Sequence, residues 1–139
     1  MAADQELAKG LLDSDCVAIA YETVTDDNGG LPLLAPMSEV AGRLAVQAGA
    51  HALEYHKGGC GILMGGVPGV KPANVVVIGG GVVGMNAARM AAGLGADVTV
   101  FDRSISRLQY IDTVYGGRIK TLVASKHAIE REVKLADLV

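Results

Sequence analysis

The clearest pattern of hydrophobic and polar positions lies in the second half of the chain. Residues 74–78 and 97–101 form two short apolar runs rich in β-branched residues, which predict strands buried on both faces. Between them, residues 83–94 are small and apolar with helical periodicity, and Gly95 follows as a helix stop. This alternation of buried strand, helix and buried strand predicts a parallel α/β sheet.

The pattern continues to the last residue. Residues 104–111 predict a short helix capped by Ser104 or Asp102, 118–123 a third strand, and 126–135 a further helix. Residues 137–139 have the composition of a fourth strand that is just beginning. We therefore predict an α/β fold of the Rossmann type, a doubly wound parallel sheet that is incomplete, with about three strands after residue 71.

The first half of the chain is less regular. Residues 3–12 predict a helix, 16–20 a short buried strand, and 25–30 a turn. A second helix is expected from Ser38, its N-cap, to about Tyr55. A loop rich in glycine and proline follows at residues 65–70, so we expect a domain boundary near residue 71.

Composition and charge exclude several classes of function. The 139 residues are 50% hydrophobic and carry a net charge of −3 without any run of Lys or Arg, so we expect no nucleic-acid partner. Cys16 and Cys60 lack metal-ligand spacing and are interpreted as reduced thiols. The start of the chain is acidic, and no apolar stretch is long enough to cross a bilayer. We expect a cytoplasmic protein without a membrane partner.

A glycine-rich segment joins the first buried strand to the helix after it. Gly79, Gly81 and Gly84 have the G-x-G-x-x-G spacing of dinucleotide-binding proteins. Gly79 permits the tight turn out of the strand, Gly81 lets a pyrophosphate approach the backbone, and Gly84 lets the helix pack closely on the strand. The helix N-terminus then offers free N–H groups and a partial positive charge. The segment predicts a pyrophosphate site.

Asp102 closes the second strand, where dinucleotide-binding folds carry an acid that binds ribose. Its carboxylate can accept hydrogen bonds from both adenosine-ribose hydroxyls and would repel a 2′-phosphate, which favours NAD over NADP. The neighbouring Arg103 keeps NADP open as an alternative. The structural alternative is a glycine turn that merely packs a helix on a sheet, with Asp102 as a helix cap. We predict NAD as the cofactor.

The remaining polar candidates give no catalytic or metal site. His51, His56 and His127 have no partner at metal or catalytic-triad spacing and are interpreted as helix-end or surface residues. From the residues alone, Ser38 is an N-cap and Arg107 a solvated helix residue. We therefore predict no catalytic residue and no metal ligand in this chain.

Three segments of the sequence, 31–43, 65–70 and 77–81, resemble the alanine dehydrogenase family, and the resemblance covers essentially the whole chain. The transhydrogenase α subunit is related in fold. The resemblance implies reversible oxidative deamination, in which L-alanine, NAD and water give pyruvate, ammonium and NADH. It also implies a homo-oligomer, hexameric in the family, and a cofactor-binding domain inserted between two parts of a catalytic domain.

The resemblance also implies roles for individual residues. Ser38 matches a serine that contacts the cofactor from an interdomain helix, and Val82 matches a contact in the glycine loop. Asp102 matches the ribose-binding acid, and Arg107 a basic residue near the adenosine ribose. Where family members often have a serine on the adenine side, this chain has Ala124, with Ser125 next to it.

The family's catalytic groups do not match residues of this chain. Its substrate-binding arginine and lysine and its catalytic histidine are expected upstream, and its catalytic aspartate downstream. The resemblance thus divides the chain into the end of the catalytic domain (1–30), an interdomain helix and linker (31–70), and the first half of the NAD-binding domain (71–139). We expect the chain alone to lack catalysis, and L-alanine or pyruvate to bind only in the complete enzyme. The alternatives are a stand-alone, non-catalytic dinucleotide-binding module or a transhydrogenase-related NAD-binding domain.

Overall fold

The computed structural model describes residues 4–139, which divide into two compact units after Pro36. In the first unit, α1 (Gln5–Asp13) begins at Asp4, whose side chain accepts a hydrogen bond from the backbone N–H of Leu7. A short 3-10 helix, η1, spans Tyr21–Thr23. The predicted turn at 25–30 is confirmed, because Asp26 Oδ1 accepts hydrogen bonds from the N–H groups of Asn28 and Gly30.

The strand predicted at residues 16–20 is wrong. The segment is extended without strand pairing, and the Val17 side chain is 90% exposed. A buried strand needs neighbours that take up its backbone hydrogen bonds and cover its side chains. The described residues of the first unit hold no other strand to provide them.

The second unit begins with most of a long helix, α2 (Ala35–Ala52). This helix starts earlier than predicted, so Ser38 lies inside its first turn and is not the N-cap. Pro36 explains the difference, because proline is favoured in the first turn of a helix, where its missing N–H removes no hydrogen bond. After α2 come a 3-10 turn, η2 (Tyr55–Lys57), and the glycine-proline loop, in which Val67 and Val70 form an isolated antiparallel bridge.

The sheet of the second unit is parallel, as predicted. Its strands are β1 (Asn74–Ile78), β2 (Asp97–Asp102) and β3 (Ile119–Val123), in the order β1-β2-β3. On the other edge of β1, Leu138 forms a parallel bridge with Val75, and its carbonyl accepts a hydrogen bond from the Val76 N–H at 2.9 Å. The spatial order is thus β3-β2-β1 followed by Leu138, the order of one half of a dinucleotide-binding fold and its next strand.

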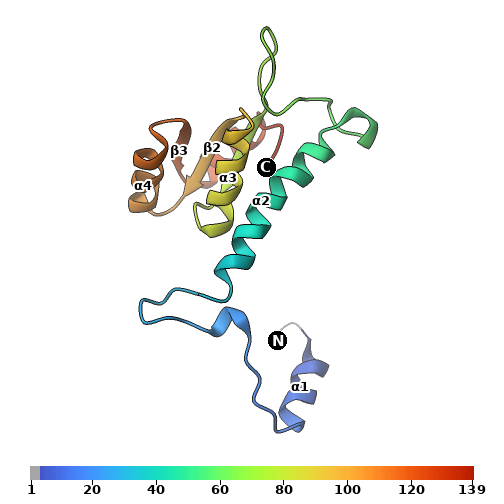
Figure 1. Ribbon diagram of the computed structural model, residues 1–139, viewed down its shortest axis with the longest axis vertical. Coiled ribbons are helices and arrows are strands. Elements are labelled where there is room, and N and C mark those ends of the chain that lie inside the picture. Colours follow the sequence, from blue (N-terminus) through green and yellow to red (C-terminus); the bar gives the residue numbers. More distant parts are fainter. Residues whose placement is uncertain (1–3) are drawn as a thin grey trace. The chain divides into compact units, whose positions relative to one another are not determined.

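Helices cover both faces of this sheet. α3 (Val82–Gly93) and α4 (Ile105–Tyr115) lie on one face (Figure 1). There, the fully buried Val98 and Val100 belong to a core that includes Ala88 and Ala91 of α3. α5 (Lys126–Val133) follows β3, and its Arg131 lines a cavity with Thr99 on the opposite face. Because the three strands are parallel, their carboxyl ends all lie at one edge of the sheet.

Candidate functional site

The glycine-rich loop leaves β1 at the carboxyl edge of the sheet. Gly79 has a φ of 102°, in the left-handed region that favours glycine, and its N–H donates to the Phe101 carbonyl at 2.7 Å. Gly84 lies in the first turn of α3, where a Cβ atom would overlap the Gly79 carbonyl oxygen and lie 3.1 Å from Val77. The fold therefore requires glycine at both positions, one for the turn and one for close packing.

Gly81 differs from Gly84 because no atom crowds it, and it differs from Gly79 because its φ is not in the left-handed region. A Cβ atom at this position would meet no heavy atom within 4 Å. Gly81 is the N-cap of α3, and Val82, the first residue of the helix, is 42% exposed. The N–H groups of a first helical turn have no acceptor inside the helix. The open space beside Gly81 therefore lies where an anion would meet free N–H groups and the positive end of the helix dipole.

Asp102 lies at the end of β2 and faces the loop. Its Oδ2 accepts a hydrogen bond of 2.7 Å from the Gly80 N–H, and its Oδ1 accepts one of 2.8 Å from the Ser104 N–H. The N–H groups of Ser104 and Gly80 lower the pKa of this carboxyl below its ordinary value, against the opposing effect of burial, and Arg107 adds to the lowering. The carboxylate is therefore ionised at neutral pH and retains lone pairs for further donors.

Arg107 is not a solvated helix residue. Its Nε donates a hydrogen bond to the Gly80 carbonyl, and its guanidinium lies over the Tyr110 ring, 5.0 Å from the centroid. The Arg107 N–H donates to the Ser104 hydroxyl, so Ser104 and not Asp102 is the N-cap of α4. The sequence could not show this, because α4 packs Arg107 against a loop that lies far away along the chain.

A cavity of about 410 Å³ opens between the carboxyl ends of the strands. Ala124 and Ser125 both line it, but the Ser125 hydroxyl caps α5 by accepting from the Ala128 N–H at 3.2 Å. The cavity is thus bordered by one acid, by two cations and by apolar or small residues. The full lining is Ile78, Gly79, Phe101, Asp102, Arg103, Ala124, Ser125, Lys126 and Ile129.

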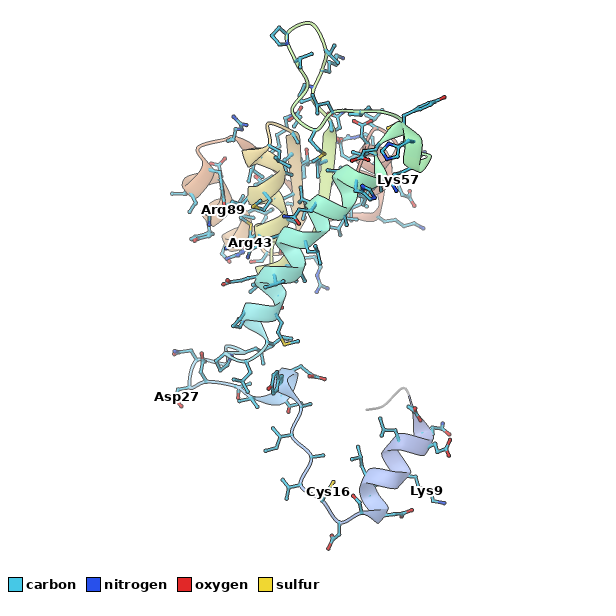
Figure 2. The ribbon with its side chains drawn as sticks, turned by 45° about the vertical axis from the view of Figure 1, so that its right-hand side comes forward. Lys9, Cys16, Asp27, Arg43, Lys57 and Arg89 are labelled. Carbon is cyan, nitrogen blue, oxygen red and sulfur yellow. The ribbon has the colours of Figure 1, made fainter. Side chains whose placement is uncertain are left out.

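Helix α2 crosses the start of α3 at close range. A Cβ atom at Gly42 would overlap the Val83 carbonyl oxygen, and Arg43 Nε donates to Asn86 Oδ1 at 3.0 Å (Figure 2). Ser38 is half-buried and lies four residues before Gly42, on the same face of α2. The structure therefore places Ser38 on the helix face that meets the first turn of α3.

The sequence matches a known family model and close relatives in that family. Residues 45–139 match the model of the alanine dehydrogenase/PNT C-terminal domain. The chain belongs to the alanine dehydrogenase/PNT family. It is 63% identical over 139 residues to an alanine dehydrogenase of Halomonas elongata and 56% identical over 138 residues to one of Bacillus subtilis. These matches cover 100% and 99% of this chain, but only 38% and 36% of the two relatives.

Solved structures give the same fold. An L-alanine dehydrogenase matches 99% of this chain and 38% of its own, with a TM-score of 0.89 and 54% identity. A dipicolinate synthase chain from Bacillus halodurans matches 91% of this chain and 36% of its own, with a TM-score of 0.63 and 21% identity, which shows the fold alone. The predicted Rossmann-type α/β fold and the predicted family are thereby confirmed. This chain spans little more than a third of the length of the relatives it matches.

The three histidines are exposed, as the sequence predicted. His51 and His56 both lie beside Glu54 on the surface, with nitrogen–oxygen distances of 3.5 and 3.2 Å. Within residues 4–139, no group of three or more His, Cys, Asp or Glu side chains is arranged to hold a metal ion. No helix of this described range combines the length and hydrophobicity needed to span a bilayer.

Sequence reasoning missed Gly80 as a site residue. Gly80 occupies an unspecified position of the G-x-G-x-x-G pattern, yet it is buried and its two backbone polar groups hold Asp102 and Arg107. The one available signal was the run of three consecutive glycines. The close approach of Gly42 to α3 had no sequence signal, because the pattern of one helix does not show which element crosses it.

Proposed function

We propose that this chain binds NAD(H) as the cofactor-binding part of an L-alanine dehydrogenase. The observation that carries the proposal is the position of the ionised Asp102 carboxylate beside the glycine-rich loop, with open space at Gly81. The loop and α3 would hold the pyrophosphate, and Asp102 would accept hydrogen bonds from the ribose hydroxyls. Val82 and Arg107 border the same site, and Ser38 approaches from α2.

The residues present fit this cofactor in shape and charge. Gly81 leaves room for phosphate oxygens, and the cavity beside Asp102 is lined mainly by small and apolar groups that suit an adenine ring. The carboxylate would repel a 2′-phosphate, which supports NAD over NADP. Arg103 and Lys126 line the same cavity but do not occupy the position of the acid.

In the complete enzyme we propose the reaction of the alanine dehydrogenase relatives. L-alanine, NAD and water would give pyruvate, ammonium and NADH, and the bound nicotinamide would supply the hydride acceptor. The residues described in this chain bind and orient the cofactor, and none of them is assigned to proton transfer. The division into 1–30, 31–70 and 71–139, the homo-oligomer and the cytoplasmic location remain predictions from the sequence.

Thermal unfolding of the purified chain tests the proposal. A ligand that binds only the folded state raises the midpoint as its concentration exceeds Kd. We expect NADH to raise the midpoint more than NADPH at equal concentration, and we expect no alanine-dependent NADH production by this chain alone. A cooperative transition that neither nucleotide shifts would refute cofactor binding, and alanine-dependent turnover would refute the absence of catalytic groups.

A further inference from the structure

The backbone of Gly80 is held at both of its polar groups. Its N–H donates to Asp102 Oδ2 at 2.7 Å, and its carbonyl accepts from Arg107 Nε. Neither bond belongs to the sheet or to a helix. Two side chains from the end of β2 and from α4 therefore fix one residue of the loop between β1 and α3.

The surroundings of Gly80 are tightly packed. A Cβ atom at this position would lie 3.0 Å from Ile111 Cδ1, 3.2 Å from Asp102 Oδ2 and 3.3 Å from Arg107 Cγ. This contrasts with Gly81, the next residue, which is open on the side where a ligand would bind. One side of the loop is thus bound to the protein, and the other side is left free.

Arg107 is itself held in place. Its backbone N–H donates to the N-cap Ser104, and its guanidinium lies over Tyr110. An arginine that is fixed at its backbone and at its planar group loses little further freedom when it makes a directed hydrogen bond. Arg107 is therefore suited to hold another group in position.

We propose that Arg107 is a positioning residue that, together with Asp102, holds the glycine-rich loop in its phosphate-binding conformation before any ligand arrives. This inference rests on the proposed dinucleotide binding. Consecutive glycines have more backbone freedom than any other residues, so an unrestrained loop would have to be ordered on binding. Holding Gly80 in advance removes much of that ordering from the binding step.

This role differs from a direct contact between Arg107 and the adenosine. A positioning role predicts that loss of Arg107 weakens ligands that carry phosphates against the loop, such as ADP and NADH. Adenosine, which has no phosphate, would bind with unchanged affinity. A direct contact with the nucleoside predicts that all three ligands weaken by the same factor.

The test compares Arg107→Met, which keeps an unbranched stem and removes the donor, with Arg89→Met on the exposed surface of α3 as the charge-matched control (Figure 2). Calorimetric titration is carried out with NADH, ADP and adenosine on the unmodified protein and both variants. We expect Arg107→Met to raise Kd for NADH and ADP about three- to tenfold, the effect of one hydrogen bond, and to leave adenosine unchanged. Arg89→Met should behave as the unmodified protein.

A second measurement needs no ligand. Amide hydrogen exchange of Gly80, whose N–H donates to Asp102, should be faster in the unliganded Arg107→Met protein than in Arg89→Met. In Arg107→Lys, whose amine can still donate to the Gly80 carbonyl, it should be slower than in Arg107→Met. Unchanged exchange in Arg107→Met, or an equal loss of affinity for all three ligands, would overturn the positioning role. An unmodified protein that fails to bind NADH would refute the proposed function instead, and the exchange data would still decide on the role of Arg107.

Discussion

Gly42 of α2 and Val83 of α3 meet backbone to backbone, with no room for a side chain at residue 42. The hydrogen bond between Arg43 and Asn86 lies beside this contact. The two helices therefore meet at a fixed crossing, which lies in the first turns of α3. Ser38, which we propose as a cofactor contact, lies one turn before this crossing on the same helix.

A Gly42→Ala substitution is expected to destabilise the fold. The added Cβ would overlap the Val83 carbonyl and force the helices apart, which corresponds to a loss of about 1–3 kcal/mol of unfolding free energy. Urea unfolding measures the effect. Gly93→Ala in α3 is the matched control, because its Cβ would meet no heavy atom within 4 Å, and it should leave stability unchanged or raise it by up to about 1 kcal/mol. Equal stability of the two variants would contradict the close crossing.

A Gly81→Ala substitution should separate binding from folding. Its Cβ points into open space in the unliganded protein, so we expect the unfolding free energy to change by about 1 kcal/mol or less. The same Cβ would occupy space proposed for the pyrophosphate, so Kd for NADH should rise at least about tenfold. Gly84→Ala is the contrasting variant, because its Cβ would overlap the Gly79 carbonyl and lower the melting temperature. Unimpaired NADH binding by a folded Gly81→Ala protein would place the phosphates elsewhere.

Replacing Asp102 by alanine should weaken NADH and relax the discrimination against NADPH. The variant would lose the charged hydrogen bonds proposed to ribose. A net loss equal to one such bond, about 1.5–3 kcal/mol, would raise Kd for NADH about 10- to 100-fold. The repulsion of a 2′-phosphate disappears at the same time, so the ratio of the two Kd values should fall. Asp112→Ala, which removes an exposed carboxylate of α4, is the control. Unchanged affinity for both nucleotides would refute the assignment of Asp102.

The same carboxyl should make stability depend on pH in one direction. Its pKa is lowered in the folded protein by the N–H groups of Ser104 and Gly80. Its contribution to stability is therefore fully present above the ordinary pKa of about 3.9 and is lost as the pH falls through the lower, folded value. The difference in unfolding free energy between the unmodified protein and Asp102→Ala should be constant above about pH 5 and shrink below about pH 4. A difference that grows on acidification would contradict the lowered pKa.

Much of the second unit could be predicted because its signals are local. The runs of β-branched residues predicted β1 and β2. Gly95, predicted as the stop of the helix before it, has a positive φ of 95° just after α3. In the segment predicted to begin a fourth strand, Leu138 pairs with Val75 in an isolated parallel bridge. The apolar run at 16–20 failed, because composition indicates what could be buried but not whether a partner is present to bury it.

The arrangement of the candidate site could be predicted in part, and its binding role stays a prediction. Spacing alone pointed to Gly79, Gly81, Gly84 and Asp102, and the structure brings them together at one edge of the sheet. What spacing could not provide are the bonds across the loop, since those from Arg107 and Asp102 to Gly80 join residues 27 and 22 positions apart. Such contacts depend on how β2 and α4 are placed against β1. The hydrophobic periodicity of each element predicts that element but not its position relative to the others.

The most direct test of cofactor binding is a calorimetric titration of the purified chain with NADH, followed by the same titration with NADPH. The account predicts saturable binding of one NADH per chain, with NADPH at least about tenfold weaker, because Asp102 is proposed to accept from ribose and would repel a 2′-phosphate. Circular dichroism on the same sample establishes that the protein is folded. A folded protein that takes up no NADH at millimolar concentration, or that binds NADPH more tightly, would contradict the account.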